Sequence, residues 1–136
     1  MSTPGSMQAV DHRNTARMKE IVEKHGWPTR SMVADDGTRC AWLLVQHGDH
    51  APAFQRNCLE LMRSHKKSEQ VFLVDLAFLT DRVLVNESKP QIYGTQFHVS
   101  GDKQQPRPMR DPENVDKRRK AMGMSTMKEY MELMHT

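Results

Sequence analysis

The segment "QVFLVDLAFLTDRVLV", residues 70–85, constrains the fold more than any other part of the chain. A continuous apolar run suits either a buried strand or a buried helix, and length separates the two because buried strands usually span about four to eight residues. This run has sixteen residues. The sequence therefore predicts a central helix whose inner face carries Phe72, Leu76, Leu79 and Val83.

The spacing of apolar residues predicts further helices on both sides of this run. They are expected at residues 11–25, from 38 to about 47, 52–65, 111–123 and from 125 onward. Pro52 suits a first helical turn, whereas Asp111 and Ser125 are expected to cap the last two helices. Gly123 should stop the helix before it. Residues 27–37, which contain the turn signal "DG", are predicted to form a loop.

A short β-hairpin is expected after the central helix. Residues 91–99, "QIYGTQFHV", alternate as a strand does, and residues 100–102 suit a hairpin turn. Residues 103–109 would form the return strand, which its prolines confine to an edge. The fold class that follows is mainly α, a compact domain of about five to six helices with a small β-hairpin near residues 91–109. For 136 residues we expect one domain at 11–136 after a disordered start at 1–10.

The balance of charge does not favour nucleic acid as a partner. Twenty basic and seventeen acidic side chains give a net charge of +3, and the basic stretch "KRRKAM" suits the C-terminal end of a helix dipole. The opening "MSTPGSMQAV" lacks the apolar core of a signal peptide, and no run approaches the roughly eighteen apolar residues of a membrane span. We therefore expect a cytoplasmic protein without a membrane partner, in which Cys40 and Cys58 are buried, reduced thiols.

Two histidines fall on helix faces that the apolar pattern predicts to be buried. His25 ends the stripe of the first helix, and His47 shares a side with apolar residues of the second. A solvated helix end is the alternative for His25. In the central helix, Asp81 and Arg82 are neighbours and therefore diverge by about 100° around the axis. One of them is expected to contact another part of the chain.

The ordered fragments "HGWP", "QHGD", "FQ", "LTDRV", "QIYGTQ" and "VDKRR" resemble the motifs of a bacterial family of unknown function, the one numbered six-six-two-four. The resemblance covers about residues 11–130 and implies no particular activity. It marks a set of mostly polar positions as important. These are His25, Gly26, Trp27, Pro28, Gln46, His47, Asp49, Gln55, Asp81, Arg82, Gln91, Tyr93, Gly94, Thr95, Gln96, Arg118 and Arg119. His50 and His98 match no motif position.

Such a polar set is either an internally bonded network or a pocket that a ligand completes, because each unsatisfied buried polar group costs about 1–3 kcal/mol. The pocket hypothesis assigns His47 as the acid/base, since an imidazole exchanges protons near neutral pH. His25 would be its partner or a hydrogen-bond donor to substrate, and Asp81 would orient an imidazole or hold an arginine. The substrate would be bound by Gln46, Arg82, Tyr93, Gln96 and Arg119.

Two functions from different classes follow from these alternatives. The leading hypothesis is an enzyme or ligand-binding domain for a small polar, anionic metabolite, with His25 and His47 at its centre. The competing hypothesis is a non-catalytic interaction module of immunity or adaptor type. In that case the polar set is a core network, and a partner docks on the methionine-rich C-terminal helix through Met127, Met131 and Met134.

A metal site is a weaker hypothesis. His47 and His50 are three positions apart, with Asp49 between them, but Gly48 and Pro52 indicate that the helix ends there. No HExxH motif or cysteine pair supplies further ligands, and neither a glycine-rich phosphate loop nor a GxSxG motif is present. We expect neither a metal nor a cofactor, although the spacing of the two histidines leaves a bound metal open.

Overall fold

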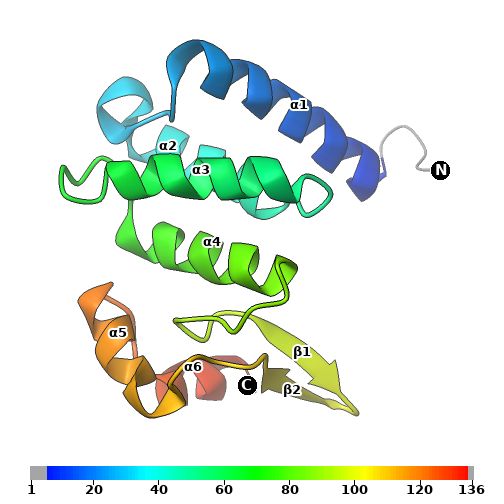
Figure 1. Ribbon diagram of the computed structural model, residues 1–136, viewed down its shortest axis with the longest axis vertical. Helices are drawn as coiled ribbons and strands as arrows, with labels where there is room; N and C mark the ends of the chain where they lie inside the picture. The colour runs from blue at the N-terminus through cyan, green and yellow to red at the C-terminus, as the bar shows by residue number, and fades with distance from the viewer. Residues whose placement is uncertain (1–5, 135–136) are drawn as a thin grey trace.

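The computed structural model describes residues 6–134, which form a mainly helical domain with a two-stranded sheet. In chain order the elements are α1 (Met7–His25), α2 (Arg30–Gln46), α3 (Pro52–Ser64), α4 (Leu73–Asn86), β1 (Phe97–Ser100), β2 (Lys103–Pro106), η1 (Pro112–Asn114), α5 (Val115–Ala121) and α6 (Met127–Met134). Figure 1 shows a stack with α1 at one end, α4 in the middle, and the hairpin, α5 and α6 at the other end. The predicted fold class is confirmed.

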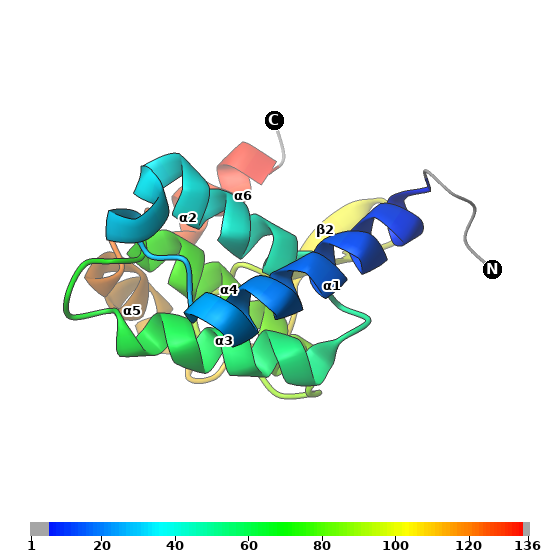
Figure 2. The same cartoon turned by 90° about the horizontal axis from the view of Figure 1, so that it is seen from above.

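The central helix predicted from the apolar run is α4. Its residues Leu76, Leu79 and Val83 are buried, and they share one core cluster with Leu59 and Met62 of α3. Viewed from above, α1 lies across α2 and α3 and covers that end of the stack (Figure 2). Packing this face of α4 against α3 removes apolar surface from water. Among the helices of residues 6–134, none is long and apolar enough to cross a membrane.

Helix α1 starts at Met7, earlier than the sequence indicated. The Ser6 side chain caps it by accepting a hydrogen bond from the Ala9 amide at 3.1 Å. At the other end, Gly26 has a φ of 75° and its amide donates to the Val22 carbonyl at 2.9 Å. Residues 7–10 are therefore helical rather than disordered. Residues 1–5 of the expected disordered start lie outside the described residues.

Helix α2 begins at Arg30, inside the stretch that was predicted to be a loop. Its first turn is followed by a kink at Ala34, whose φ of 65° and ψ of 176° are not helical. The connection between α3 and α4 holds this first turn, because the amides of Arg30 and Ser31 donate to the backbone carbonyl and the side chain of Gln70, both at 2.9 Å. Tertiary hydrogen bonds thus outweigh the turn signal at residues 36–37.

The hairpin is shorter than predicted. β1 and β2 pair antiparallel, with Phe97 opposite Pro106 and Ser100 opposite Lys103. Residues 91–96 do not form a strand, and this stretch contributes an isolated bridge between Gln91 and Met109. The prediction of a strand over residues 91–99 is therefore wrong for its first six residues. The alternating residue pattern of this stretch does not mark a half-buried strand, because most of its backbone amides donate to side chains instead of to a neighbouring strand.

Gly123, predicted as a helix stop, follows α5 and has a φ of 72°. Its amide donates to the Lys120 carbonyl at 3.0 Å, and the Met124 amide donates to the Arg119 carbonyl at 2.9 Å. This pair of bonds is a Schellman motif, in which a residue of positive φ allows the last carbonyls of a helix to be paired. The prediction of a glycine stop is confirmed.

The predicted caps of the last two helices differ from the observed ones. The Asp111 side chain accepts a hydrogen bond from the Asn114 side chain at 2.8 Å and caps no helical amide. Helix α6 is preceded by Thr126, which pairs with Glu129 in a reciprocal capping box: each side chain accepts the other residue's amide at 3.2 Å. Ser125 is therefore not the cap of this helix.

The two cysteines lie in different environments. Cys58 of α3 is fully buried, and this burial raises the pKa of its thiol to about 12. Cys40 of α2 is exposed, so the expectation of two buried thiols is wrong for this residue. Helix α2 turns Cys40, Leu43 and His47 outward together. The apolar pattern had placed that face inside because the segment is apolar on all sides.

Candidate functional site

A buried carboxylate of α4, that of Asp81, organises the loop formed by residues 91–96. Its Oδ1 accepts hydrogen bonds from the amides of Ile92 (2.8 Å) and Tyr93 (3.0 Å). Its Oδ2 accepts from the amide (3.0 Å) and the hydroxyl (2.8 Å) of Thr95. Asp81 is 0% exposed, so these donors replace the water that burial removes. Burial raises the pKa of Asp81, and the hydrogen bonds from the loop oppose that rise.

Two glutamines close the same loop on itself. The Gln91 side chain accepts from the Gln96 amide at 2.8 Å and donates to the carbonyls of Gln96 and Arg107, both at 2.9 Å. Each polar atom of that side chain therefore has a protein partner, and the residue is fully buried. The Gln96 side chain donates to the Thr95 hydroxyl at 3.0 Å. These glutamines stabilise the loop and do not offer free groups to a ligand.

Arg82, the neighbour of Asp81, links the loop to the turn before α3. Its Nε donates to Asp49 Oδ1 at 2.9 Å, its Nη2 donates to Asp49 Oδ2, and its Nη1 donates to Gln96 Oε1 at 3.0 Å. Asn86 and Gln55 also donate to Asp49. Desolvation tends to raise the pKa of Asp49, but these bonds and the charge of Arg82 outweigh it and lower the pKa. Arg82 therefore binds a carboxylate of the protein rather than an anionic ligand.

Two arginines of α5 hold the loop through its carbonyl groups. Arg118 Nε donates to the Ile92 carbonyl at 2.8 Å, and Arg119 Nη1 donates to the Tyr93 carbonyl at 2.7 Å. Arg119 is 1% exposed and also donates to the Ser125 carbonyl at 2.6 Å. The predicted role of Arg119 in binding an anionic group is not what these bonds indicate. Its guanidinium is occupied by the main chain.

The remaining predicted site residues lie in different environments. His25 and His47 are both exposed, at the C-terminal ends of α1 and α2. The expectation that His47 faces inward is therefore wrong, and of the two alternatives for His25 the solvated helix end is the one observed. Gln46 is buried, but its side chain accepts from the Trp42 indole at 3.1 Å and donates to the Phe78 carbonyl at 3.2 Å. The acid/base assignment of the two histidines stays a prediction.

Tyr93, one of the predicted site residues, lines a cavity. This cavity, here called the Tyr93 cavity, has a volume of about 300 Å³. Its described lining residues are Arg63, Lys66, Leu76, Thr80, Ile92, Tyr93 and Met122. They come from the end of α3 and the turn after it, from α4, from the loop at 91–96 and from the end of α5. The Asp81-bound loop therefore forms one wall of the cavity.

The Tyr93 cavity is lined by two cations, Arg63 and Lys66, and by no carboxylate among its described lining residues. Arg63 lies 3.6 Å from Glu60, with both side chains more than half exposed, so this ion pair neutralises little of its charge. Sequence reasoning missed Lys66 because residues 65–70 have the composition of a solvated link, and it assigned no role to Arg63, which lies inside the helix predicted at residues 52–65. The signal that could have indicated them is their i, i+3 spacing at a helix end, which places them side by side.

Two hydroxyl groups complete the polar lining. Burial raises the pKa of Tyr93 and the charge of Asp81 adds to the rise, so the phenol is a neutral hydrogen-bond donor at neutral pH. The Thr80 hydroxyl donates to the Leu76 carbonyl at 2.7 Å. Its oxygen can therefore accept a hydrogen bond but has no second proton to donate.

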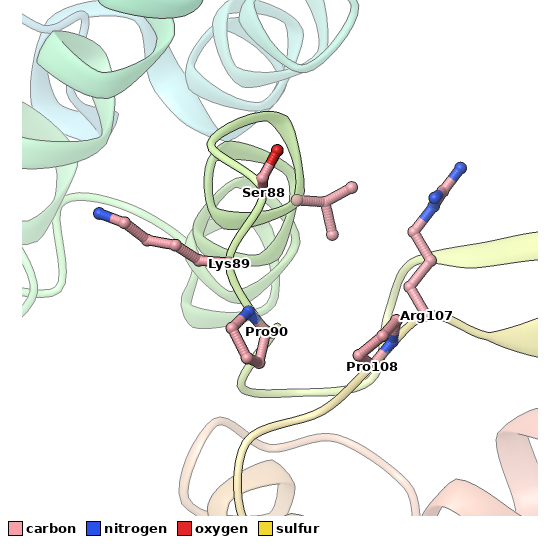
Figure 3. Close-up of a pocket in the computed structure, with 6 residues that line it drawn as sticks. Ser88, Lys89, Pro90, Arg107 and Pro108 are labelled. Atoms are coloured by element: carbon pink, nitrogen blue, oxygen red, sulfur yellow. The ribbon is translucent and has the colours of Figure 1, made fainter.

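A second cavity, of about 340 Å³, lies beside the start of the loop and is lined by Val85, Ser88, Lys89, Pro90, Arg107 and Pro108. Figure 3 shows the charged ends of Lys89 and Arg107 pointing away from each other. Lys89 also lies 3.3 Å from the Glu87 carboxylate. The cations of this cavity do not converge on one point, so it is a weaker site for an anion than the Tyr93 cavity.

In residues 6–134, no group of three or more His, Cys, Asp or Glu side chains is arranged to hold a metal ion. His47 and His50, which the sequence suggested as a pair of metal ligands, are not part of such a group. His50 stacks instead on His12 of α1, with ring centroids 3.8 Å apart and planes 10° from parallel.

The fold and these contacts define a class: a small helical domain in which a polar loop is held between α4 and α5 and forms one wall of a basic cavity. The chain belongs to a family of unknown function (DUF6624), whose model matches residues 3–136. The resemblance drawn from the motifs is confirmed. No curated protein and no solved structure matches the chain.

Proposed function

We propose that the protein binds a small anionic metabolite in the Tyr93 cavity. The observation that carries the proposal is that Arg63, Lys66 and Tyr93 line one cavity of about 300 Å³ whose described lining includes no carboxylate. Small-molecule sites enclose roughly 300–1,000 Å³, so this volume suits a ligand of metabolite size. A concave surface that carries one sign of charge concentrates ligands of the opposite sign.

Each part of the lining contributes one kind of contact. The guanidinium of Arg63 and the ammonium of Lys66 bind the anionic group. The neutral phenol of Tyr93 donates a hydrogen bond, and the Thr80 oxygen accepts one from a ligand hydroxyl. The apolar lining residues cover the carbon skeleton. A compact ligand with one anionic end and a hydroxyl group satisfies all of these contacts.

The bonds to the loop support the proposal because they fix the wall of the cavity in advance. Ile92 and Tyr93 donate their amides to Asp81 and accept bonds at their carbonyls from Arg118 and Arg119. A wall held through both sets of backbone groups loses little conformational entropy when a ligand binds. Asp81, Arg118 and Arg119 therefore have a positioning role in this proposal: they shape the cavity wall without touching the ligand.

The proposal is for binding rather than for acid/base catalysis at this cavity. The Asp81 carboxylate is fully buried and already accepts four hydrogen bonds, so it is not accessible to a substrate proton. The exposed His25 and His47 do not line the Tyr93 cavity. The groups that line it are cations, hydroxyls and apolar side chains, which suit recognition.

The competing hypothesis, an interaction module, has one element that fits the structure and one that does not. The polar set is bonded internally, as that hypothesis expects. The methionine face of α6 is less suited to docking, because Met127 is 8% exposed and its sulfur accepts a hydrogen bond from Arg119 at 3.3 Å. Met131 and Met134 are half-buried. We therefore favour the binding site over the docking surface.

A calorimetric comparison of variants tests the proposal. Anionic metabolites, with inorganic phosphate and sulfate as reference probes, are first ranked by the rise in melting temperature that they cause. Binding of the best compounds is then measured by isothermal titration calorimetry for wild type, Arg63→Gln and Lys66→Gln. Each variant removes one charge-assisted contact, and we expect each to weaken binding about five- to tenfold. Tyr93→Phe, which removes only the phenolic donor, should cost less.

Lys117→Gln is the matched control, because Lys117 is an exposed lysine of α5 that does not line the cavity. It should bind each compound as wild type does. If every compound that binds wild type binds Arg63→Gln and Lys66→Gln with unchanged affinity, the Tyr93 cavity is not the site. If no anion binds wild type, the proposal is wrong.

A further inference from the structure

A second basic cavity meets the first at Lys66. It has a volume of about 460 Å³ and is lined by Arg30, Lys66, Lys67, Glu69, Val71, Phe72 and Leu73. We call it the Lys67 cavity. Lys66 lines both cavities, so the two cavities share this side chain. Two adjacent cavities that share a cation suit one elongated ligand better than two separate small ones.

We propose that the anion bound by this protein carries at least two adjacent phosphate-type groups, as a diphosphate or triphosphate does, and lies across Lys66. One group would occupy the Tyr93 cavity between Arg63 and Tyr93, and the next would reach Lys67 in the Lys67 cavity. This inference rests on the proposed function and names the chemical class of its ligand.

The charge around the two cavities supports a ligand of more than one negative charge. Their combined described lining holds four cations, Arg30, Arg63, Lys66 and Lys67, and one carboxylate, that of Glu69. Arg30 is partly compensated, since its guanidinium donates to Asp35 at 2.8 Å. The remaining cations exceed what a monoanion would neutralise, and each added phosphate group would bring its charge close to a further lysine.

The turn that carries the two lysines is held in place. The Lys66 amide donates to the Arg63 carbonyl at 3.2 Å, and the Gln70 amide donates to the His65 carbonyl at 3.4 Å. The Gln70 carbonyl in turn accepts the Arg30 amide at 2.9 Å, which ties the turn to the start of α2. The backbone positions of the lysines are therefore fixed before a ligand arrives, which lowers the entropic cost of binding.

The lining favours a small polyphosphate over a nucleic acid. A single-strand binder stacks bases on exposed aromatic rings. The aromatic side chain of the Lys67 cavity, Phe72, already contacts two guanidinium groups: those of Arg30 and Arg39 lie 4.7 and 4.9 Å from the ring centroid. The ring is therefore engaged by the protein itself. The basic lining remains for phosphate groups.

The test compares orthophosphate, pyrophosphate and tripolyphosphate by isothermal titration calorimetry on the full chain, in buffer with EDTA. We expect pyrophosphate to bind about tenfold more tightly than orthophosphate, because its second phosphate group binds as part of the same molecule. Lys67→Gln should remove most of this advantage and leave the affinity for orthophosphate within about twofold of wild type. Lys66→Gln should weaken both probes. Lys117→Gln should change neither.

The outcomes separate the two proposals. If orthophosphate binds in a manner sensitive to Arg63→Gln but pyrophosphate binds no more tightly, the two-phosphate inference is wrong and the Tyr93 cavity stands. An unchanged pyrophosphate advantage in Lys67→Gln also overturns the inference. If neither probe nor any other anion binds, the proposed function itself fails. Tighter binding of an oligothymidylate than of tripolyphosphate would show that the ligand is a nucleic acid instead.

Discussion

Asp81 and Thr95 are joined twice, because the amide and the hydroxyl of Thr95 both donate to Asp81 Oδ2, at 3.0 and 2.8 Å. The two residues are fourteen positions apart, one on α4 and the other in the loop at residues 91–96. The contact sets the path of the loop over α4. Since that loop forms a wall of the Tyr93 cavity, the stability of the contact and the shape of the cavity depend on each other.

Asp81→Asn should destabilise the protein by about 2–4 kcal/mol. An asparagine keeps one oxygen, so its NH2 group would face either the Thr95 donors or the amides of Ile92 and Tyr93, and those buried donors would lose their partner. The free energy of unfolding, measured by urea denaturation at pH 7, tests this. The exposed Asp36→Asn is the control. If Asp81→Asn lowered the free energy of unfolding by less than about 0.5 kcal/mol, this carboxylate would not be important for stability.

Gly94→Ala should be more destabilising than Gly101→Ala. Both glycines have a similar positive φ, 69° and 67°, so both substitutions carry the same backbone cost, of about 1 kcal/mol. A Cβ at Gly94 would also collide with the Met127 sulfur, whereas a Cβ at Gly101 meets nothing within 4 Å. The difference between the two melting temperatures therefore measures the cost of the close contacts that the added Cβ makes with Met127 and Met109. Equal melting temperatures would show that Met127 moves aside without cost.

Asp49 should contribute stability that disappears in acid. Its pKa is lowered from 3.8, because the bonds from Arg82, Asn86 and Gln55 outweigh desolvation. A carboxyl group with a lowered folded pKa stabilises the protein above its unfolded pKa, and this contribution is lost as the pH falls through the folded value. Asp49→Asn should therefore cost about 0.5–1 kcal/mol at pH 7 and progressively less below about pH 4. Urea denaturation of both proteins at several pH values tests this, and a constant difference would contradict it.

The two thiols should differ in reactivity. Cys40 is exposed, whereas Cys58 is fully buried with a pKa raised to about 12. Because the thiolate is the reactive form, the native protein should react quickly with Ellman's reagent at one thiol and expose the second only on unfolding. Cys40→Ser should abolish the fast reaction. Fast modification of Cys58 in that variant would show that α3 opens readily.

Several features of the fold could be predicted because they depend on local pattern. The apolar run at residues 70–85 is too long for a buried strand, and it forms α4. The neighbours Asp81 and Arg82 diverge on this helix: Asp81 binds the loop alone, whereas Arg82 binds Asp49 as well as Gln96 of the loop. Gly123 stops α5 as expected. The order of the motifs was enough to indicate the family.

Other predictions failed where the local sequence pattern fitted two different structures equally well. Around residues 40–45 the second helix is apolar on all sides, so the sequence did not determine which face is buried, and His47 and Cys40 were placed inside although both are exposed. Residues 91–96 alternate as a strand does, but Asp81 accepts their amides in place of a neighbouring strand. In both cases, contacts between distant segments of the chain determine which of the two structures forms.

The sequence by itself determined the helical class, the C-terminal ends of most helices and the set of polar positions that mark the family, because periodicity, terminal signals and motif order act over a few residues. Only the tertiary structure decided that most of those polar residues bond one another, and that Arg63 and Lys66 face the same cavity as Tyr93. The physical reason is that a buried hydrogen bond or a shared cavity depends on which segments pack together; about thirty residues of chain separate Arg63 and Lys66 from Tyr93.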